Sequence, residues 1–262
     1  MPDFSEQDLH DSLFQGTDLR KSTFRGADLS GARLYAVDLD HVVMRGVSLI
    51  DVDIHGEIER LFVNGVDVAP YVNAELDRRH PERAGMRPTD PAGFRAAWDV
   101  LERLWDGTVA RARRLEPGLL HESVDGEWSF IETLRHLAFA TDCWVSRAIL
   151  GDPRPWHPLG LPWDEMRDTP GVPRDRTARP SLDEALAVRR GRAATVRKLL
   201  DALTEQRLDA ETEPVPGPGY PPPGRYPVRT CLLCILNEEW EHRLYAERDL
   251  AVLEARAATA AG

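Results

Sequence analysis

The sequence predicts an α+β protein of two domains, in which a stack of short coils precedes an all-α four-helix bundle. Three observations support this fold class. Apolar residues recur every five positions over residues 1–56, four later segments carry them at helical spacing, and a proline-rich segment separates the second of these segments from the third. We expect domain boundaries at 1–56 for the coils, 57–90 for a connector and 91–258 for the bundle.

The N-terminal pattern places one large apolar residue in each five-residue unit. These residues are Phe4, Leu9, Phe14, Leu19, Phe24, Leu29, Leu34, Leu39, Met44, Leu49 and Ile54. A period of five fits neither a helix nor a strand, but it fits a chain that turns a corner every five residues with its apolar side chains inside. The pattern, clearest in STFRGADLSGARL, resembles the pentapeptide-repeat family. That resemblance implies a short right-handed quadrilateral β-helix of just under three coils.

The connector contains signals for three short elements. IERLFVNGVDVA, residues 58–69, predicts a hairpin around Asn64 and Gly65, a pair suited to positive φ. YVNAELDRRHPERAG then predicts a short helix, and RPTDPAG predicts a break before the bundle.

Four helices are predicted for the bundle, over 94–115, 128–150, 181–203 and 228–256. Two of them begin with a capping box, formed by Ser129 with Glu132 and by Ser181 with Glu184. The crossover between the second and third helices, GDPRPWHPLGLPWDEMRDTPGVPRDRTARP, is long for a connection without regular structure. We therefore expect it to cross the bundle or to build a site.

Composition excludes several classes of protein. A net charge of −11 argues against nonspecific binding to nucleic acid or to an anionic membrane. No apolar run approaches roughly 20 residues, and the first residues, MPDFSEQDLH, lack the basic and apolar regions expected of a signal peptide. Three cysteines are too few for a disulfide framework. We expect a cytoplasmic protein. Lysine occurs only at Lys21 and Lys198, which is typical of GC-rich genomes such as those of actinobacteria.

Polar residues interrupt two of the predicted helices. Glu238 and His242 are four residues apart and share one face of the last helix. His136, on the second helix, lies in a stripe with the small residues Thr133 and Ala140, which leave space beside it. Ordinary hydrogen-bonded histidines are one interpretation of this pattern, and a metal site is the other.

The segments WSFIETLRHLAFATDCW and NEEWEHRLYAERDL resemble the DinB-like superfamily of four-helix-bundle metalloproteins, over about residues 58–256. The resemblance implies that His136, Glu238 and His242 are metal ligands. The superfamily includes thiol-dependent S-transferases and mycothiol-dependent maleylpyruvate isomerases. A divalent-metal-binding, thiol-dependent S-transferase or isomerase acting on a small electrophile is therefore expected, with a low-molecular-weight thiol such as mycothiol as cosubstrate.

Two imidazoles and a carboxylate suit zinc, with nickel or iron as alternatives, and leave a coordination position open for chemistry. Glu241 or Asp249 is expected to orient a ligand histidine, unless Glu241 is simply solvated. Tyr245, His157 and Trp163 are candidates for the pocket, although His157 fits loop packing equally well. The CxxC spacing of Cys231 and Cys234 lies in an apolar run and favours packing. The sequence identifies no general base.

A non-catalytic scaffold or interaction protein is the alternative function, with the repeats as a partner or homodimer surface. Some pentapeptide-repeat proteins resemble duplex DNA and act on topoisomerases. Residues 1–56 hold ten acidic and five basic residues, so the sign of the charge is compatible. The stack is short, however, and basic residues interrupt its acidic faces, so we favour a scaffold or dimerisation role over DNA mimicry.

Overall fold

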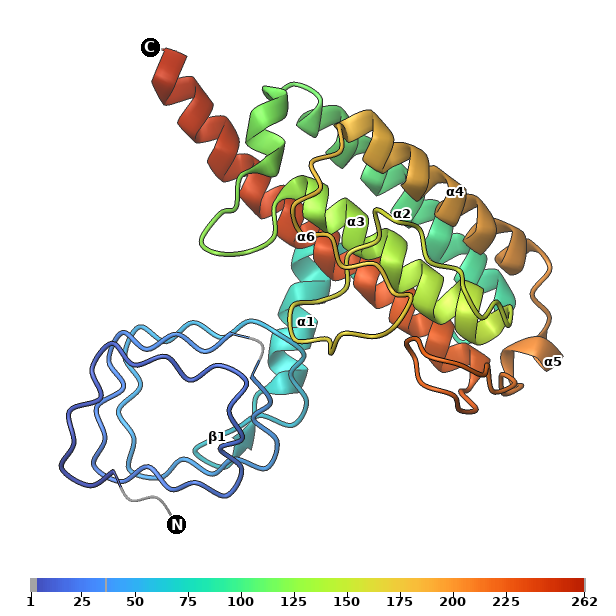
Figure 1. The fold of residues 1–262 in the computed structure, drawn as a ribbon. Coiled ribbons are helices and arrows are strands. Elements are labelled where there is room, and N and C mark those ends of the chain that lie inside the picture. Colours follow the sequence, from blue (N-terminus) through green and yellow to red (C-terminus); the bar gives the residue numbers. More distant parts are fainter. Residues whose placement is uncertain (1–3, 36, 262) are drawn as a thin grey trace. The chain divides into compact units, whose positions relative to one another are not determined.

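The computed structural model describes residues 4–35 and 37–261. It divides the chain into two compact units, Met1–Ile54 and His55–Gly262 (Figure 1). Residues 1–3 and 36 of the predicted repeat domain lie outside the described residues. Among the described helices, none combines the length and the apolar character that crossing a membrane requires.

The described backbone of the repeat unit turns at intervals of five residues. Positive φ angles occur at Glu6, Asp11, Gly16, Lys21, Gly26, Gly31, His41, Gly46, Asp51 and Gly56. The turns are closed by local hydrogen bonds, such as those from the Ser12 N–H to the Leu9 carbonyl (3.1 Å) and from the Ser22 N–H to the Leu19 carbonyl (3.0 Å). Positive φ at the third of four residues is the geometry of a type II turn. The predicted corner is confirmed in the units whose corner residue the structure describes.

The predicted burial and β-structure of the repeats are not seen. The large apolar side chains of the eleven units are between 41% and 65% exposed, with Leu9 and Phe24 at the two limits. Residues 4–35 and 37–57 contain no strand. A coil of this kind buries its apolar residues only against neighbouring coils. Because no strands pair one coil with the next in this described part of the chain, these side chains stay exposed.

The connector folds as its turn residues predict. Strands β1 (Phe62–Val63) and β2 (Val66–Asp67) pair antiparallel. The turn between them has positive φ at both Asn64 and Gly65, as a two-residue hairpin requires. Helix α1 (Ala69–Arg79) and the 3₁₀ turn η1 (Pro81–Met86) follow. The predicted hairpin and short helix are confirmed.

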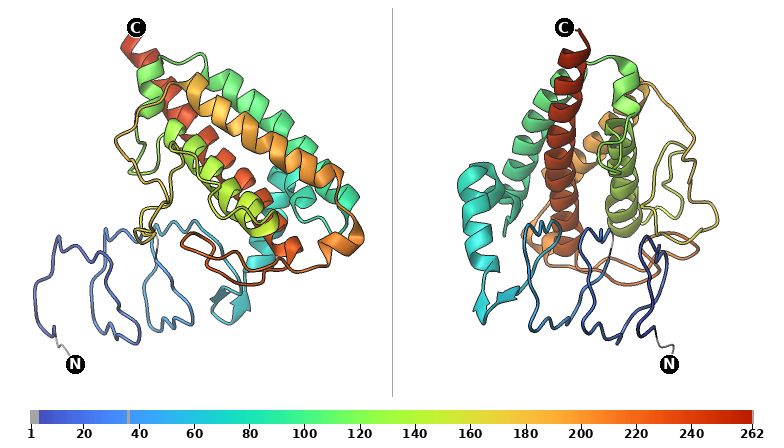
Figure 2. Two further views of the ribbon diagram at one scale, coloured as in Figure 1. Left: turned by 45° about the vertical axis from the view of Figure 1, so that its right-hand side comes forward. Right: turned by 90° about the vertical axis from the view of Figure 1, so that its left-hand side faces the viewer.

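Four long helical segments form the bundle, which Figures 1 and 2 show from three directions. They are α2 (Pro91–Ala112), α3 (Phe130–Thr141) with its extension η3 (Asp142–Ile149), α4 (Leu182–Asp201) and α6 (Val228–Ala261). Helix α6 packs on α2 and α3, and α4 packs on the same two helices. The shorter η2 (Pro117–His121) and α5 (Glu205–Leu208) lie in the connections. Both predicted capping boxes are present.

The extension η3 is π-helical, whereas the sequence predicted one continuous α-helix over 128–150. A π-helical turn bonds residue i to residue i+5 and brings residues five apart onto one face. Asp142 and Arg147 are five apart, and both are buried. Asp142 forms a bidentate ion pair with Arg192 of α4 (both contacts 2.9 Å). Arg147 donates to the carbonyls of segments 151–181 and 209–227, so η3 holds both connections.

Candidate metal centre

Helix α3 carries the most deeply buried member of the site. The capping box at Ser129 and Glu132 sets the start of the helix, and His136 lies two turns further on. His136 is 6% exposed. Its Nδ1 lies 3.0 Å from the carbonyl oxygen of Leu161 in the crossover. A carbonyl only accepts, so Nδ1 carries the proton and Nε2 is free to bind a cation.

The Leu161 carbonyl is held in place by the residue next to His136. The Leu161 N–H donates to the Arg135 carbonyl (3.3 Å), which ties this point of the crossover to α3. The buried guanidinium of Arg135 donates to the carbonyls of Leu159 (2.9 Å), Asp175 and Ala178 (3.3 Å). The crossover thus builds part of the site, which is one of the two roles predicted for it.

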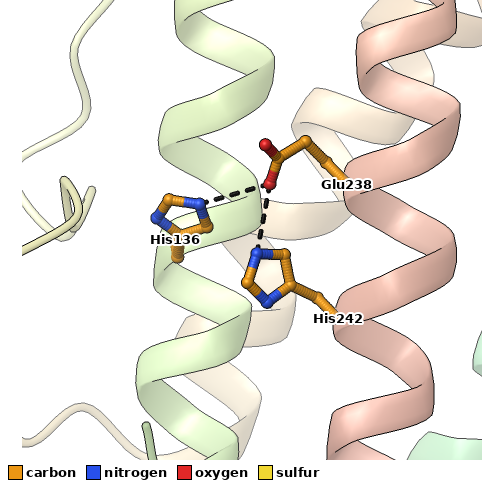
Figure 3. A group of neighbouring side chains, drawn as sticks. All are labelled: His136, Glu238 and His242. Atoms are coloured by element: carbon orange, nitrogen blue, oxygen red, sulfur yellow. Dashed lines mark hydrogen bonds and ion pairs between the residues drawn. The ribbon is translucent and has the colours of Figure 1, made fainter. Parts of the chain in front are cut away.

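Helix α6 supplies the other two members. Glu238 and His242 are four residues apart and point toward His136 (Figure 3). Oε2 of Glu238 lies 3.3 Å from Nε2 of His136 and 3.1 Å from Nε2 of His242. One donor atom from each of the three residues lies within 4.8 Å of the other two. The structure therefore brings together the three residues that the sequence nominated.

The donor set fits a divalent metal such as zinc. Ligand atoms bound at about 2.1 Å to a tetrahedral ion lie about 3.4 Å from one another. The separations of 3.3 and 3.1 Å from Glu238 to the two histidines are close to this value. Three protein ligands leave one tetrahedral position free, as in catalytic zinc sites. The side chains of Glu238 and His242 are 27% and 20% exposed, so the site is reachable from solvent.

The electrostatics of the site favour the protonation states that metal binding requires. Burial, the largest influence, lowers the pKa of His136, although the Glu238 carboxylate acts in the opposite direction. Burial acts to raise the pKa of Glu238, but the interactions with His136 and His242 outweigh it and hold this pKa well below its ordinary value. A neutral imidazole and an ionised carboxylate are the states in which these groups coordinate a metal ion.

Comparison with known families agrees with this geometry. The DinB superfamily profile matches residues 100–246, which include all three candidate ligands and most of the bundle. The chain belongs to the DinB superfamily. Eight copies of the pentapeptide repeat match within residues 3–34 and 27–56. No curated protein and no solved structure matches the chain.

The supporting residues predicted for the DinB-like domain lie at different distances from the three ligands. Tyr245 stands edge-on to His242, with ring centroids 6.0 Å apart. Glu241 is half-buried. Burial raises its pKa, whereas Arg83, His242 and His80 act in the opposite direction. Nδ1 of His136 is bound by the Leu161 carbonyl, and not by Glu241 or Asp249, the two residues expected to orient a ligand histidine. Asp249 accepts a hydrogen bond from Arg248.

Trp163 and His157 lie in the crossover, and Trp163 is one layer of side chains away from His136. Trp163 contacts Phe139 (6.4 Å between ring centroids), and Phe139 in turn contacts His136 (6.5 Å). The backbone N–H of His157 donates to Asp142, and its Nδ1 accepts from the Leu159 N–H (3.1 Å). His157 is thus engaged in the packing of the crossover, the alternative that the sequence left open for it.

Sequence reasoning missed two contributors to the DinB-like site. The Leu161 carbonyl is a backbone group and has no sequence signature. Trp128 precedes the capping box of α3, and its ring lies against both imidazoles, 4.4 Å from His136 and 5.7 Å from His242 between centroids. An aromatic residue next to a helix start near a ligand histidine was the available signal.

Proposed function

We propose that the DinB-like domain binds one divalent metal, zinc in the first place, through His136, Glu238 and His242. We further propose that it uses this metal in thiol-dependent transfer to, or isomerisation of, a small electrophile. The observation that carries the proposal is the convergence of three donor groups: Oε2 of Glu238 lies 3.3 Å from Nε2 of His136 and 3.1 Å from Nε2 of His242. The Leu161 carbonyl meanwhile engages Nδ1 of His136 and leaves its Nε2 directed at the other two groups.

A divalent metal bound there lowers the pKa of a thiol or water at its open position, so that a nucleophile is present at neutral pH. The chain's own residues prepare the site for this chemistry. Leu161 orients His136, and Glu238 supplies negative charge that offsets the charge of the cation. The Trp128 ring lies against both imidazoles, and the Tyr245 ring meets that of His242 edge-on.

The thiol is proposed to be of the mycothiol type, in keeping with the composition of the chain and with the thiol-dependent branches that its helices resemble. The electrophile is proposed to be a small molecule. Direct binding of nucleic acid is not part of the proposal, since a net charge of −11 opposes contact with phosphates. The same charge opposes docking to an anionic membrane.

For the repeat unit, we propose closure into a right-handed quadrilateral β-helix that serves as a scaffold or homodimer surface. The support is the apolar period of five together with the positive φ that recurs at intervals of five among the described residues. Closure would bury the large apolar residue of each unit against the neighbouring coils. It would also pair the backbone of each coil with that of the next.

Metal analysis of protein purified without an affinity tag tests the metal site. We expect about one equivalent of metal per chain. His136→Ala and His242→Ala variants should lose it while keeping the helical circular dichroism of the parent. His121→Ala, at the end of η2, is the matched control and should keep the metal. Wild-type protein that is metal-free and cannot be reconstituted would refute the metal site and leave the scaffold role.

The reaction class is tested separately on metal-loaded protein. Turnover of small electrophiles should require both the metal and a low-molecular-weight thiol, and it should be absent in His242→Ala. Metal-loaded protein that consumes no thiol with a panel of electrophiles, and isomerises none of them in its presence, would retain the metal site but contradict the thiol chemistry.

A further inference from the structure

The two candidate histidine ligands differ in how their rings are held. The ring of His136 is held by the hydrogen bond from its Nδ1 to the Leu161 carbonyl, and its Nε2 faces Glu238 at 3.3 Å. His242 has Nε2 near Glu238 (3.1 Å), but no hydrogen bond to its Nδ1 is found among residues 4–35 and 37–261. Ligand histidines usually have a hydrogen-bond partner on the second nitrogen, which fixes the ring plane. Something else must orient His242.

Trp128 contacts the His242 ring by stacking, in place of a hydrogen bond to Nδ1. Its indole ring is stacked on the His242 imidazole with an interplanar angle of 12° and a centroid separation of 5.7 Å. The same indole packs on His136 at 4.4 Å, tilted by 45°. Tyr245 meets the His242 ring edge-on, at 85°. Ring contacts with Trp128 and Tyr245 therefore define the plane of His242.

The position of Trp128 follows from the start of α3. Trp128 immediately precedes the N-cap, where the Ser129 N–H and Oγ both donate to the Glu132 carboxylate (2.9 and 2.8 Å). On its other side the Glu127 N–H donates to the Val124 carbonyl (3.0 Å), which closes a turn through Asp125 and Gly126. Both turn residues have positive φ. The backbone of Trp128 is thus held on both sides, and its half-buried side chain has little freedom.

We propose that Trp128 is a positioning residue for the metal centre, which holds the imidazole of His242 in its ligating plane and packs it against that of His136. The inference rests on the proposed metal site. It assigns to a side chain outside the ligand set the orienting role that a hydrogen-bonding partner has in most histidine–metal sites. Loss of the indole frees the His242 ring to rotate, and metal affinity falls although every ligand remains.

The test measures zinc affinity by competition with a chromophoric chelator in wild type, Trp128→Leu, Trp128→Phe and Trp144→Leu. We expect Trp128→Leu to raise the Kd by about 10-fold or more. Trp128→Phe should restore most of the affinity because it keeps an aromatic face. Trp144 is the matched control, since it is also half-buried but contacts Tyr220 and Tyr226. Its substitution should leave the Kd unchanged.

Cobalt quenching of tryptophan fluorescence gives a second measurement that does not need the leucine variant to fold. Cobalt bound beside Trp128 should quench wild type more strongly than Trp128→Phe. Equal zinc affinity in wild type and a folded Trp128→Leu overturns the positioning role and leaves the metal site standing. Equal cobalt quenching places the ion away from Trp128 and overturns both. Wild-type protein that binds neither ion refutes the metal site itself, so the two failures are distinguishable.

Discussion

The repeat unit and the helical unit both have regular sequences, yet only one of them buries its apolar residues. In the helical unit, Phe94, Leu101 and Leu137 are at most 1% exposed, whereas no large apolar residue of the eleven repeat units is less than 41% exposed. A helix satisfies its own backbone and needs neighbours only for its apolar face. A five-residue coil needs neighbours for both its backbone and its apolar residues. Periodicity therefore predicts the local turn in both units, but burial only in the bundle.

The largest loss of stability is expected at Arg147, a buried charged residue that donates hydrogen bonds to two of the connecting segments of the bundle. Arg147 is 1% exposed and donates to four carbonyls, of which those of Val215 (3.1 Å) and Pro221 (3.2 Å) form fully buried hydrogen bonds. Arg147→Met leaves these two oxygens without a donor. We expect a loss of about 3 kcal/mol in the free energy of unfolding of the bundle, measured by urea titration followed by circular dichroism.

The control for this variant is Arg190→Met, on the exposed face of α4. It removes an equal charge from solvent and should change the same free energy by less than about 0.5 kcal/mol. Equal effects of the two substitutions would show that Arg147 does not anchor the 209–227 segment.

A substitution in the repeat unit tests directly whether the large apolar side chains of the repeats are buried. If the proposed β-helix closes, Phe24→Ser removes a buried aromatic side chain and should destabilise the repeat unit by roughly 2 kcal/mol. Hydrogen exchange of amides within residues 4–54 measures this loss without interference from the bundle. The neighbouring Arg25→Ser is the control. Identical exchange in the two variants would mean that Phe24 stays in solvent, as its 65% exposure describes.

At the site, too, the sequence predicted features set by local spacing, and it did not predict those set by contacts between distant segments. Glu238 and His242 were found because helical spacing places residues four apart on one face. The convergence with His136 followed from a resemblance between helices, and the structure bears out the geometry. The Leu161 carbonyl was not predictable, because the path of the crossover depends on Arg135 bonds that form only in three dimensions. The π-helical turn likewise depends on partners distant in sequence, Arg192 among them.

A smaller effect is expected at the start of α3, where one side chain caps the helix beside the site. Ser129→Ala removes the bonds between the Ser129 hydroxyl, the Glu132 N–H (3.3 Å) and the Glu132 carboxylate (2.8 Å). Such caps contribute about 1 kcal/mol to the free energy of unfolding. Ser181→Ala, which breaks the equivalent box of α4 away from the metal centre, is the control.

The two cap variants should lose similar stability but differ in metal binding. Only Ser129 adjoins Trp128, so only Ser129→Ala is expected to weaken zinc binding, as followed by chelator competition. Equal metal affinity in the two variants would show that the cap stabilises α3 without affecting the ligands.

The smallest effects are expected from replacing glycine by alanine, which should lower the stability of the repeat unit but raise that of the helical unit. Gly26 has φ +64° at a corner of the repeat, and Gly191 lies inside α4 with no heavy atom within 4 Å of an added Cβ. Gly26→Ala places a Cβ in the left-handed region and should destabilise the repeat unit by about 1 kcal/mol. Gly191→Ala lowers the entropy of the unfolded chain and should stabilise the bundle by about 0.5–1 kcal/mol. Hydrogen exchange within each unit reads both effects in one experiment. Two changes of the same sign would mean that the five-residue corners do not depend on positive φ, and that the repeat unit tolerates side chains as a helix does.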